Sequence, residues 1–180
     1  MNRVIGRGAL VCASALALAV AFASPGLAAT APVQSCAHLS GTGTFTPGLT
    51  NTPRNQTVTA KGSETGCTPS ATTGGSGTLT ATIKVANGSC AKLGQGNQKL
   101  TGTGTTTWKN KKVSHYTLTF TTGTGSNIET ATITGKVASG LFAGHLVTGQ
   151  IKFKTVGTVN CTTEPVKNIT FTNSKPMVIH

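Results

Sequence analysis

Residues 78–85, Thr-Leu-Thr-Ala-Thr-Ile-Lys-Val, alternate strictly between polar and apolar side chains. Successive side chains of a β-strand point to opposite faces, so this period places the four apolar residues on one face. The threonines and the lysine then occupy the other face. The stretch therefore predicts a strand with one buried and one solvated side.

The same alternation recurs along most of the chain. In residues 113–122 it turns Tyr116, Leu118 and Phe120 inward, and in residues 145–155 it turns Val147, Ile151 and Phe153 inward. No window shows the spacing of an amphipathic helix. The sequence thus predicts an all-β protein, with strands over residues 40–46, 56–62, 78–85, 100–108, 113–122, 129–137, 145–155 and 167–172.

Residues that favour turns separate these predicted strands. Asn87-Gly88 is typical of a two-residue hairpin, Lys109-Asn110-Lys111 links two strands, and Gly140–Gly144 links two more. About eight short strands with short connections predict a single antiparallel Greek-key β-sandwich, immunoglobulin-like in architecture, over residues 30–180. A closed barrel is the main alternative.

The first 29 residues have the pattern of a secretion signal. Arg3 and Arg7 supply positive charge, Ala9–Ala23 is an apolar run, and small residues near Ala28 and Ala29 suit signal peptidase. The run is too short for a convincing membrane span. We therefore expect residues 1–29 to be cleaved and the protein to be secreted, with no membrane span.

Four cysteines remain after this segment: Cys36, Cys67, Cys90 and Cys161. In an exported domain they predict two disulfides, for which three pairings are possible. The sequential pairing, Cys36–Cys67 and Cys90–Cys161, is favoured by the positions of the cysteines relative to the strands. A metal site would need closely spaced thiolates, and the sequence has no Cys-x-x-Cys.

Several short motifs are shared with one group of proteins. They are Cys36, Pro47-Gly48-Leu49-Thr50, Cys67, Ser76-Gly77-Thr78-Leu79, Cys90, the Gly-Thr-Gly run before Trp108, Ser139–Gly144 and Cys161. In these features the chain resembles small secreted, disulfide-containing β-sandwich proteins of actinobacteria. The resemblance implies a family and a disulfide pattern, and it implies no activity.

The inventory of reactive side chains disfavours an enzyme. The chain has no aspartate, and its carboxylates are Glu64, Glu129 and Glu164, which we expect to be surface residues. Gly140–Gly144 resembles a nucleophile elbow but has Phe142 where the serine would stand. The histidines are not spaced as metal ligands. We therefore predict no catalytic residue, no metal and no cofactor.

The positive charge of the chain is interpreted first as keeping a surface rich in threonine and glycine soluble, and the alternative is that it binds an anionic partner. The chain has 15 Lys and Arg against 3 acidic residues, a formal net charge of +12. The lysines are scattered singly except at Lys109, Lys111 and Lys112, whereas a nucleic-acid site would show clustered basic residues among aromatics. We expect no nucleic-acid partner. A cell-wall polymer or another exported protein is the candidate partner.

Two aromatic residues flank this lysine turn. Trp108 and Tyr116 alternate in phase with apolar residues of their strands, so we expect both side chains to belong to the core. If they were exposed instead, they would form a flat aromatic surface for stacking sugars beside Lys109, Lys111 and Lys112. The sequence thus predicts a non-enzymatic exported binding or surface-interaction domain. The alternatives are a module that binds polysaccharide or anionic wall polymer through these five residues, and an enzyme inhibitor acting through the loop 47–53.

Overall fold

The structure is a computed structural model that describes residues 31–124, 129–157 and 161–180. The predicted signal peptide, residues 1–29, lies outside the described residues. The elements in chain order are β1 (Gln34–Leu49), β2 (Arg54–Thr68), α1 (Ser70–Thr73), β3 (Ser76–Gly88), α2 (Cys90–Gly94), β4 (Lys99–Trp108), β5 (Val113–Thr122), β6 (Thr130–Gly140), β7 (Leu146–Thr155) and β8 (Val166–Ile179).

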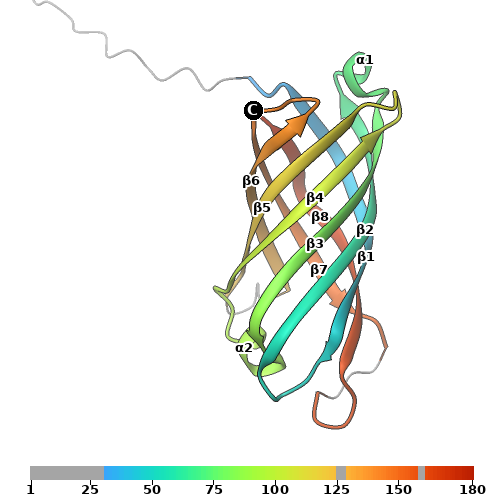
Figure 1. Cartoon of the computed structure of the whole chain (residues 1–180). Helices are drawn as coiled ribbons and strands as arrows, with labels where there is room; N and C mark the ends of the chain where they lie inside the picture. The colour runs from blue at the N-terminus through green and yellow to red at the C-terminus, as the bar shows by residue number, and fades with distance from the viewer. Residues whose placement is uncertain (1–30, 125–128, 158–160) are drawn as a thin grey trace, which may run out of the picture.

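The eight strands form one closed antiparallel barrel rather than two packed sheets (Figure 1). Each strand pairs with the next along the chain, and β8 returns to pair with β1 from Gln34↔Ile179 to Leu49↔Val166. The prediction of an immunoglobulin-like Greek-key β-sandwich is therefore wrong, although the all-β class is confirmed. Alternation marks one buried face of each strand, and that face looks the same in a sandwich and in a barrel.

Glycines on the inner face allow the sheet to close tightly. Gly41 of β1 lies opposite Gly62 of β2 on one side and opposite Phe171 of β8 on the other. A Cβ atom on Gly41 would lie only 2.5 Å from Cζ of Phe171 and 2.7 Å from Cα of Gly62. The phenyl ring thus occupies space that any other residue at position 41 would fill.

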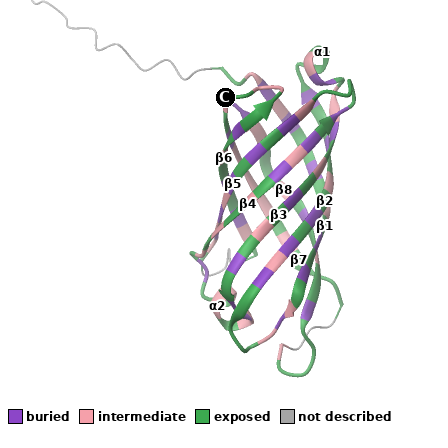
Figure 2. Ribbon diagram, in the orientation of Figure 1, coloured by how far each residue is buried: buried purple, intermediate pink, exposed green. Residues whose placement is uncertain are grey.

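The inner face is apolar and the outer face is rich in threonine and lysine. Ala81 and Val85 are buried, as are Tyr116, Leu118 and Phe120, while Thr82 and Lys84 between them are exposed. Figure 2 shows buried and exposed residues alternating along the strands. The predicted inward faces are therefore confirmed, and they line the interior of the barrel.

Each end of the barrel has one short helix, so the two ends are named here the α1 end and the α2 end (Figure 1). The predicted hairpin at Asn87-Gly88 is wrong. The chain turns at Asn87, where φ is 50°, and enters α2, whose first turn is capped because Ser89 Oγ accepts a hydrogen bond of 3.1 Å from Lys92 N. A helix this short leaves no periodic pattern in the sequence.

One disulfide lies at each end of the barrel, and the predicted sequential pairing is confirmed. Cys36–Cys67 joins β1 to β2 at the α1 end, where the two residues are direct cross-strand neighbours. Cys90–Cys161 joins α2 to the connection between β7 and β8 at the α2 end. Both bonds are consistent with an extracellular protein. None of the helices in the described residues is long and apolar enough to cross a membrane.

Candidate functional site

The described residues enclose two adjoining cavities inside the barrel, together called the lumen here. The cavity toward the α1 end has a volume of about 80 Å³, and the cavity toward the α2 end has a volume of about 280 Å³. The two cavities are adjacent, because five residues line both of them: Val58, Ile83, Phe120, Ile151 and Ile169. Most of that lining is aliphatic or aromatic, which suits an apolar guest.

Three polar side chains interrupt the apolar lining at the α1 end: Gln34, Glu64 and Tyr116. Glu64 is the most unusual of them, because it is only 4% exposed. It lies on the inner face of β2, in step with Val58 and Ala60, and opposite Leu39 of β1. The expectation that Glu64 is a surface residue is therefore wrong. Its even-numbered position, continuing the inward residues of β2, was the signal in the sequence that could have revealed it.

Burial sets the ionisation of this end of the lumen. Removal from water raises the pKa of the Glu64 carboxyl to about 7, because the charged form loses its hydration. The pKa of the Tyr116 hydroxyl is raised mainly by burial and further by the charge of Glu64, while the hydroxyls of Thr106 and Ser114 act in the opposite direction. Glu64 can thus change its charge near neutral pH, whereas Tyr116 stays neutral.

Gln34 brings a second buried acceptor to the same end. Its side chain is 1% exposed, and its Nε2 donates a hydrogen bond of 3.4 Å to Oγ1 of Thr73 in α1. Its Oε1 has no hydrogen-bond partner among the described residues. A buried carbonyl oxygen without a donor costs free energy, so this atom is ready to accept a hydrogen bond from a guest.

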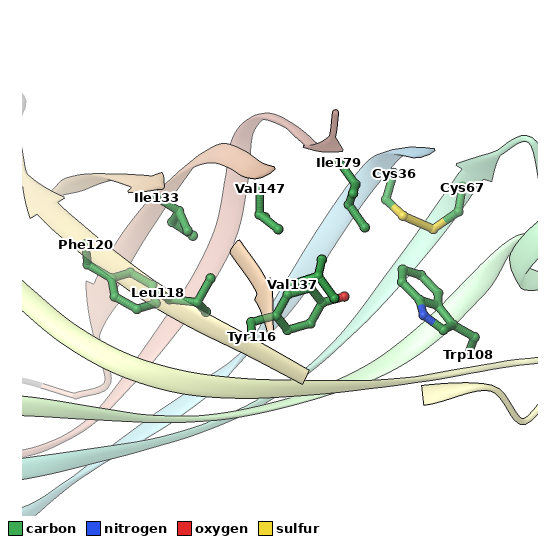
Figure 3. Packing of buried hydrophobic residues seen from close by; sticks show 10 residues of the cluster. All are labelled: Cys36, Cys67, Trp108, Tyr116, Leu118, Phe120, Ile133, Val137, Val147 and Ile179. Carbon is green, nitrogen blue, oxygen red and sulfur yellow. A yellow bond between two sulfur atoms is a disulfide. The ribbon is translucent and has the colours of Figure 1, made fainter. Parts of the chain in front are cut away.

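Trp108 and Tyr116 lie inside the barrel, which confirms that they belong to the core. Trp108 is 2% exposed, its Nε1 donates a 2.8 Å hydrogen bond to Oγ of Ser114, and the ring of Phe142 meets it edge-on with centroids 6.0 Å apart. Figure 3 shows Trp108 and Tyr116 among the side chains that converge on the interior. Both residues line the lumen.

The lysines of the proposed ligand set lie elsewhere. Lys109, Lys111 and Lys112 are exposed on the turn between β4 and β5, which is held to α1 by a hydrogen bond from Asn110 Nδ2 to the Thr72 carbonyl oxygen. The structure therefore separates these lysines from the two aromatic residues. It does not bring the five together on one exposed face.

One cluster near the lumen has the spacing of metal ligands. Atoms of Cys36, Glu64 and Cys67 lie within 4.8 Å of one another, and Oε2 of Glu64 is 4.0 Å from the Cys36 sulfur. Both sulfur atoms belong to the disulfide, so neither is a thiolate that could bind a metal ion. With that bond intact the cluster offers a cation one carboxylate and no more.

The α2 end of the lumen is wider and less polar. Leu49, Leu93 and Leu100 contribute to its wall, and the Cys90–Cys161 disulfide borders it. Its one carboxylate, Glu129, is exposed. The buried polar side chains Gln34 and Glu64 therefore belong to the α1 half of the lumen, and the α2 half offers a larger, mainly apolar chamber.

Comparison with protein-family models, with curated proteins and with solved structures finds no match to this chain.

Proposed function

We propose that this protein is an exported, non-enzymatic binding protein that holds a small apolar molecule in the lumen of its barrel. The observation that supports the proposal is the continuous apolar lining inside a closed sheet, reaching from Leu49 near one end to Ile179 near the other. Eight-stranded barrels have an interior just large enough for side chains or one small ligand. Here small inward residues such as Gly43, Ala60 and Ala81 leave that space unfilled by protein.

The free energy available is adequate for useful affinity. Each methylene group moved from water into the lumen contributes about 0.8 kcal/mol, which is about a fourfold gain in affinity. A rigid barrel also spends little free energy on reorganising when it binds. For straight-chain alcohols we therefore expect the dissociation constant to fall about fourfold per added methylene, until the chain is too long for the lumen.

The experiment uses Trp108, the single tryptophan of the chain, which lines the lumen. Its fluorescence is followed while n-hexanol to n-decanol are added, and N-phenyl-1-naphthylamine serves as an independent fluorescent probe. The variant Ala81→Phe fills the α1-end cavity, and Thr82→Phe places the same side chain on the outer face of β3 as the control. Circular dichroism checks that both variants fold.

The proposal expects binding in the wild type and in Thr82→Phe, with a loss of at least tenfold in Ala81→Phe. If folded wild-type protein binds none of these probes, the proposal is wrong. If Ala81→Phe and Thr82→Phe bind equally well, the probes do not occupy the α1-end cavity, and the proposed placement of the guest is wrong.

A second candidate function concerns the exposed lysine turn. We propose that Lys109, Lys111 and Lys112 retain the protein on an anionic cell-wall polymer, because three cations in four residues give the densest charge on the chain. Replacing all three by alanine should lower retention on purified cell walls at about 0.05 M salt, where screening is weak. Changing the dispersed Lys84, Lys136 and Lys154 to alanine is the control of equal charge. Equal retention of the two triple variants would reject a specific role for the turn.

A further inference from the structure

The α1 end of the lumen presents hydrogen-bond acceptors that no described side chain satisfies. Among the described residues, no nitrogen or oxygen donates a hydrogen bond to the carboxyl of Glu64. The side-chain atom that its Oε2 meets is the sulfur of Cys36, 4.0 Å away, which belongs to a disulfide and has no hydrogen to donate. The Oε1 atom of Gln34 is also without a partner there. Both side chains line the same cavity and both are almost fully buried.

The lumen also lacks a positive charge to balance Glu64. Lysine, arginine and histidine are missing from the described lining of both cavities, although the chain as a whole carries a net charge of +12. A buried carboxylate without a cationic partner is costly. The α1 end of the lumen thus holds a buried acidic group without a cationic partner among the described lining residues, and a guest with a positive charge would balance it.

We propose that the guest is an amphipathic amine, whose apolar body lies along the lumen and whose amino group lies at the α1 end beside Glu64 and Gln34. This inference rests on the proposed function of the lumen. An ammonium group donates up to three hydrogen bonds and carries the complementary charge, so its chemistry matches both acceptors that line this cavity. A carboxylate head would face two acceptors and one like charge, and a hydroxyl head would bring a single donor and no charge.

The ionisation of Glu64 gives the proposal a pH signature. The carboxyl is neutral below about pH 7 and charged above it, while an alkyl ammonium group stays protonated to about pH 10. Among the described residues at this end of the lumen, the titratable groups are Glu64 and Tyr116 of β5. Cys36 of β1 is in a disulfide, and the residue of α1 that reaches this end is Thr73, so neither of these titrates. Affinity for an amine should therefore rise as the pH increases from 5.5 to 8.5.

The test compares three guests with the same apolar body: n-octylamine, n-octanol and sodium octanoate. Binding is measured by isothermal titration calorimetry at pH 5.5 and 8.5 in about 0.5 M salt, which reduces the influence of the basic exterior. At pH 8.5 octylamine should bind at least tenfold more tightly than octanol, and octanoate most weakly. The advantage of the amine over the alcohol should shrink at pH 5.5.

Two variants locate the head group. Glu64→Gln should bring octylamine down to the affinity that octanol has for the same variant at pH 8.5, and it should remove the pH dependence. Glu164→Gln, the same change at an exposed site, should leave all values unchanged. The pH comparison on wild-type protein provides a second measurement if Glu64→Gln does not fold.

The outcomes separate this inference from the proposed function. If the three guests bind the wild type equally, or octanoate binds best, the amine proposal is overturned while the lumen remains a binding site. If Glu129→Gln rather than Glu64→Gln removes the preference for octylamine, the head group lies at the α2 end, and the placement is wrong. If neither these guests nor the alcohols bind, the proposed function itself fails.

Discussion

Glu64 of β2 lies directly opposite Leu39 of β1, and both side chains are buried inside the barrel. A carboxyl group thus occupies a position that the alternation of the strand reserves for an apolar residue. The side chains around it are part of the core, so the protein bears a free-energy cost for Glu64 whenever the carboxyl is charged. That cost makes the residue measurable in stability as well as in binding.

Stability should fall as the pH rises through the range set by Glu64. The folded-state pKa of about 7 exceeds the ordinary value of 4.5, so the folded protein holds a proton that the unfolded chain has lost between these values. The free energy of unfolding should therefore decrease by about 3 kcal/mol from pH 4.5 to pH 7 on account of this group. Urea unfolding from pH 4 to pH 8 measures the effect. Glu64→Gln should remove this decrease, and Glu164→Gln should retain it.

The Cys90–Cys161 disulfide should contribute much of the stability. It closes a loop between residues 71 positions apart, and the loss of chain entropy on closing such a loop corresponds to about 4 kcal/mol. Replacing both cysteines by alanine should lower the free energy of unfolding by that amount in urea titrations. An equal free energy of unfolding with and without the bond would show that the α2 end does not depend on it.

Glycines that face backbone should tolerate alanine less well than glycines that face a flexible side chain. A Cβ on Gly41 would meet Cα of Gly62 at 2.7 Å and the ring of Phe171, so Gly41→Ala should cost about 1–3 kcal/mol of stability. On Gly149 it would meet the thioether of Met177, which can move aside. Thermal unfolding should therefore show a larger loss for Gly41→Ala than for Gly149→Ala. The reverse order would contradict this account of closure.

The hydrogen bonds around Ser114 should be important to the core. Its hydroxyl accepts from Trp108 Nε1 at 2.8 Å and donates to the Leu141 carbonyl oxygen at 2.6 Å. Ser114→Ala leaves a buried indole N–H without a partner, which should cost about 1–3 kcal/mol and alter the emission of Trp108. The control is Thr105→Ala, which removes an exposed 3.1 Å contact with His115 and should change stability by less than about 0.5 kcal/mol.

Much of the local structure could be predicted from the sequence. Alternation identified the inward residues Tyr116, Leu118 and Phe120, because period two is imposed by strand geometry alone. It also located all eight strands, although β1 and β8 extend well beyond the predicted ranges 40–46 and 167–172. The turn at Lys109–Lys112 followed from its composition, and the sequential disulfides from the positions of four cysteines. The strands and the turn depend on residues that are near one another in the chain. The disulfides required only a choice among three possible pairings.

Barrel closure and the polar end of the lumen were decided only in the tertiary structure. Gln34 pairs with Ile179, and no local pattern states that the first and last strands meet. The neighbours of Glu64 in the sequence, Gly62, Ser63 and Gly66, are typical of a turn and favour the surface position that we expected for it. The register of β2 between β1 and β3 directs it inward instead, and the pairing of β1 with β2 brings it to the same cavity as Gln34. Alternation tells which side of a strand is buried, and only long-range pairing tells what that side encloses.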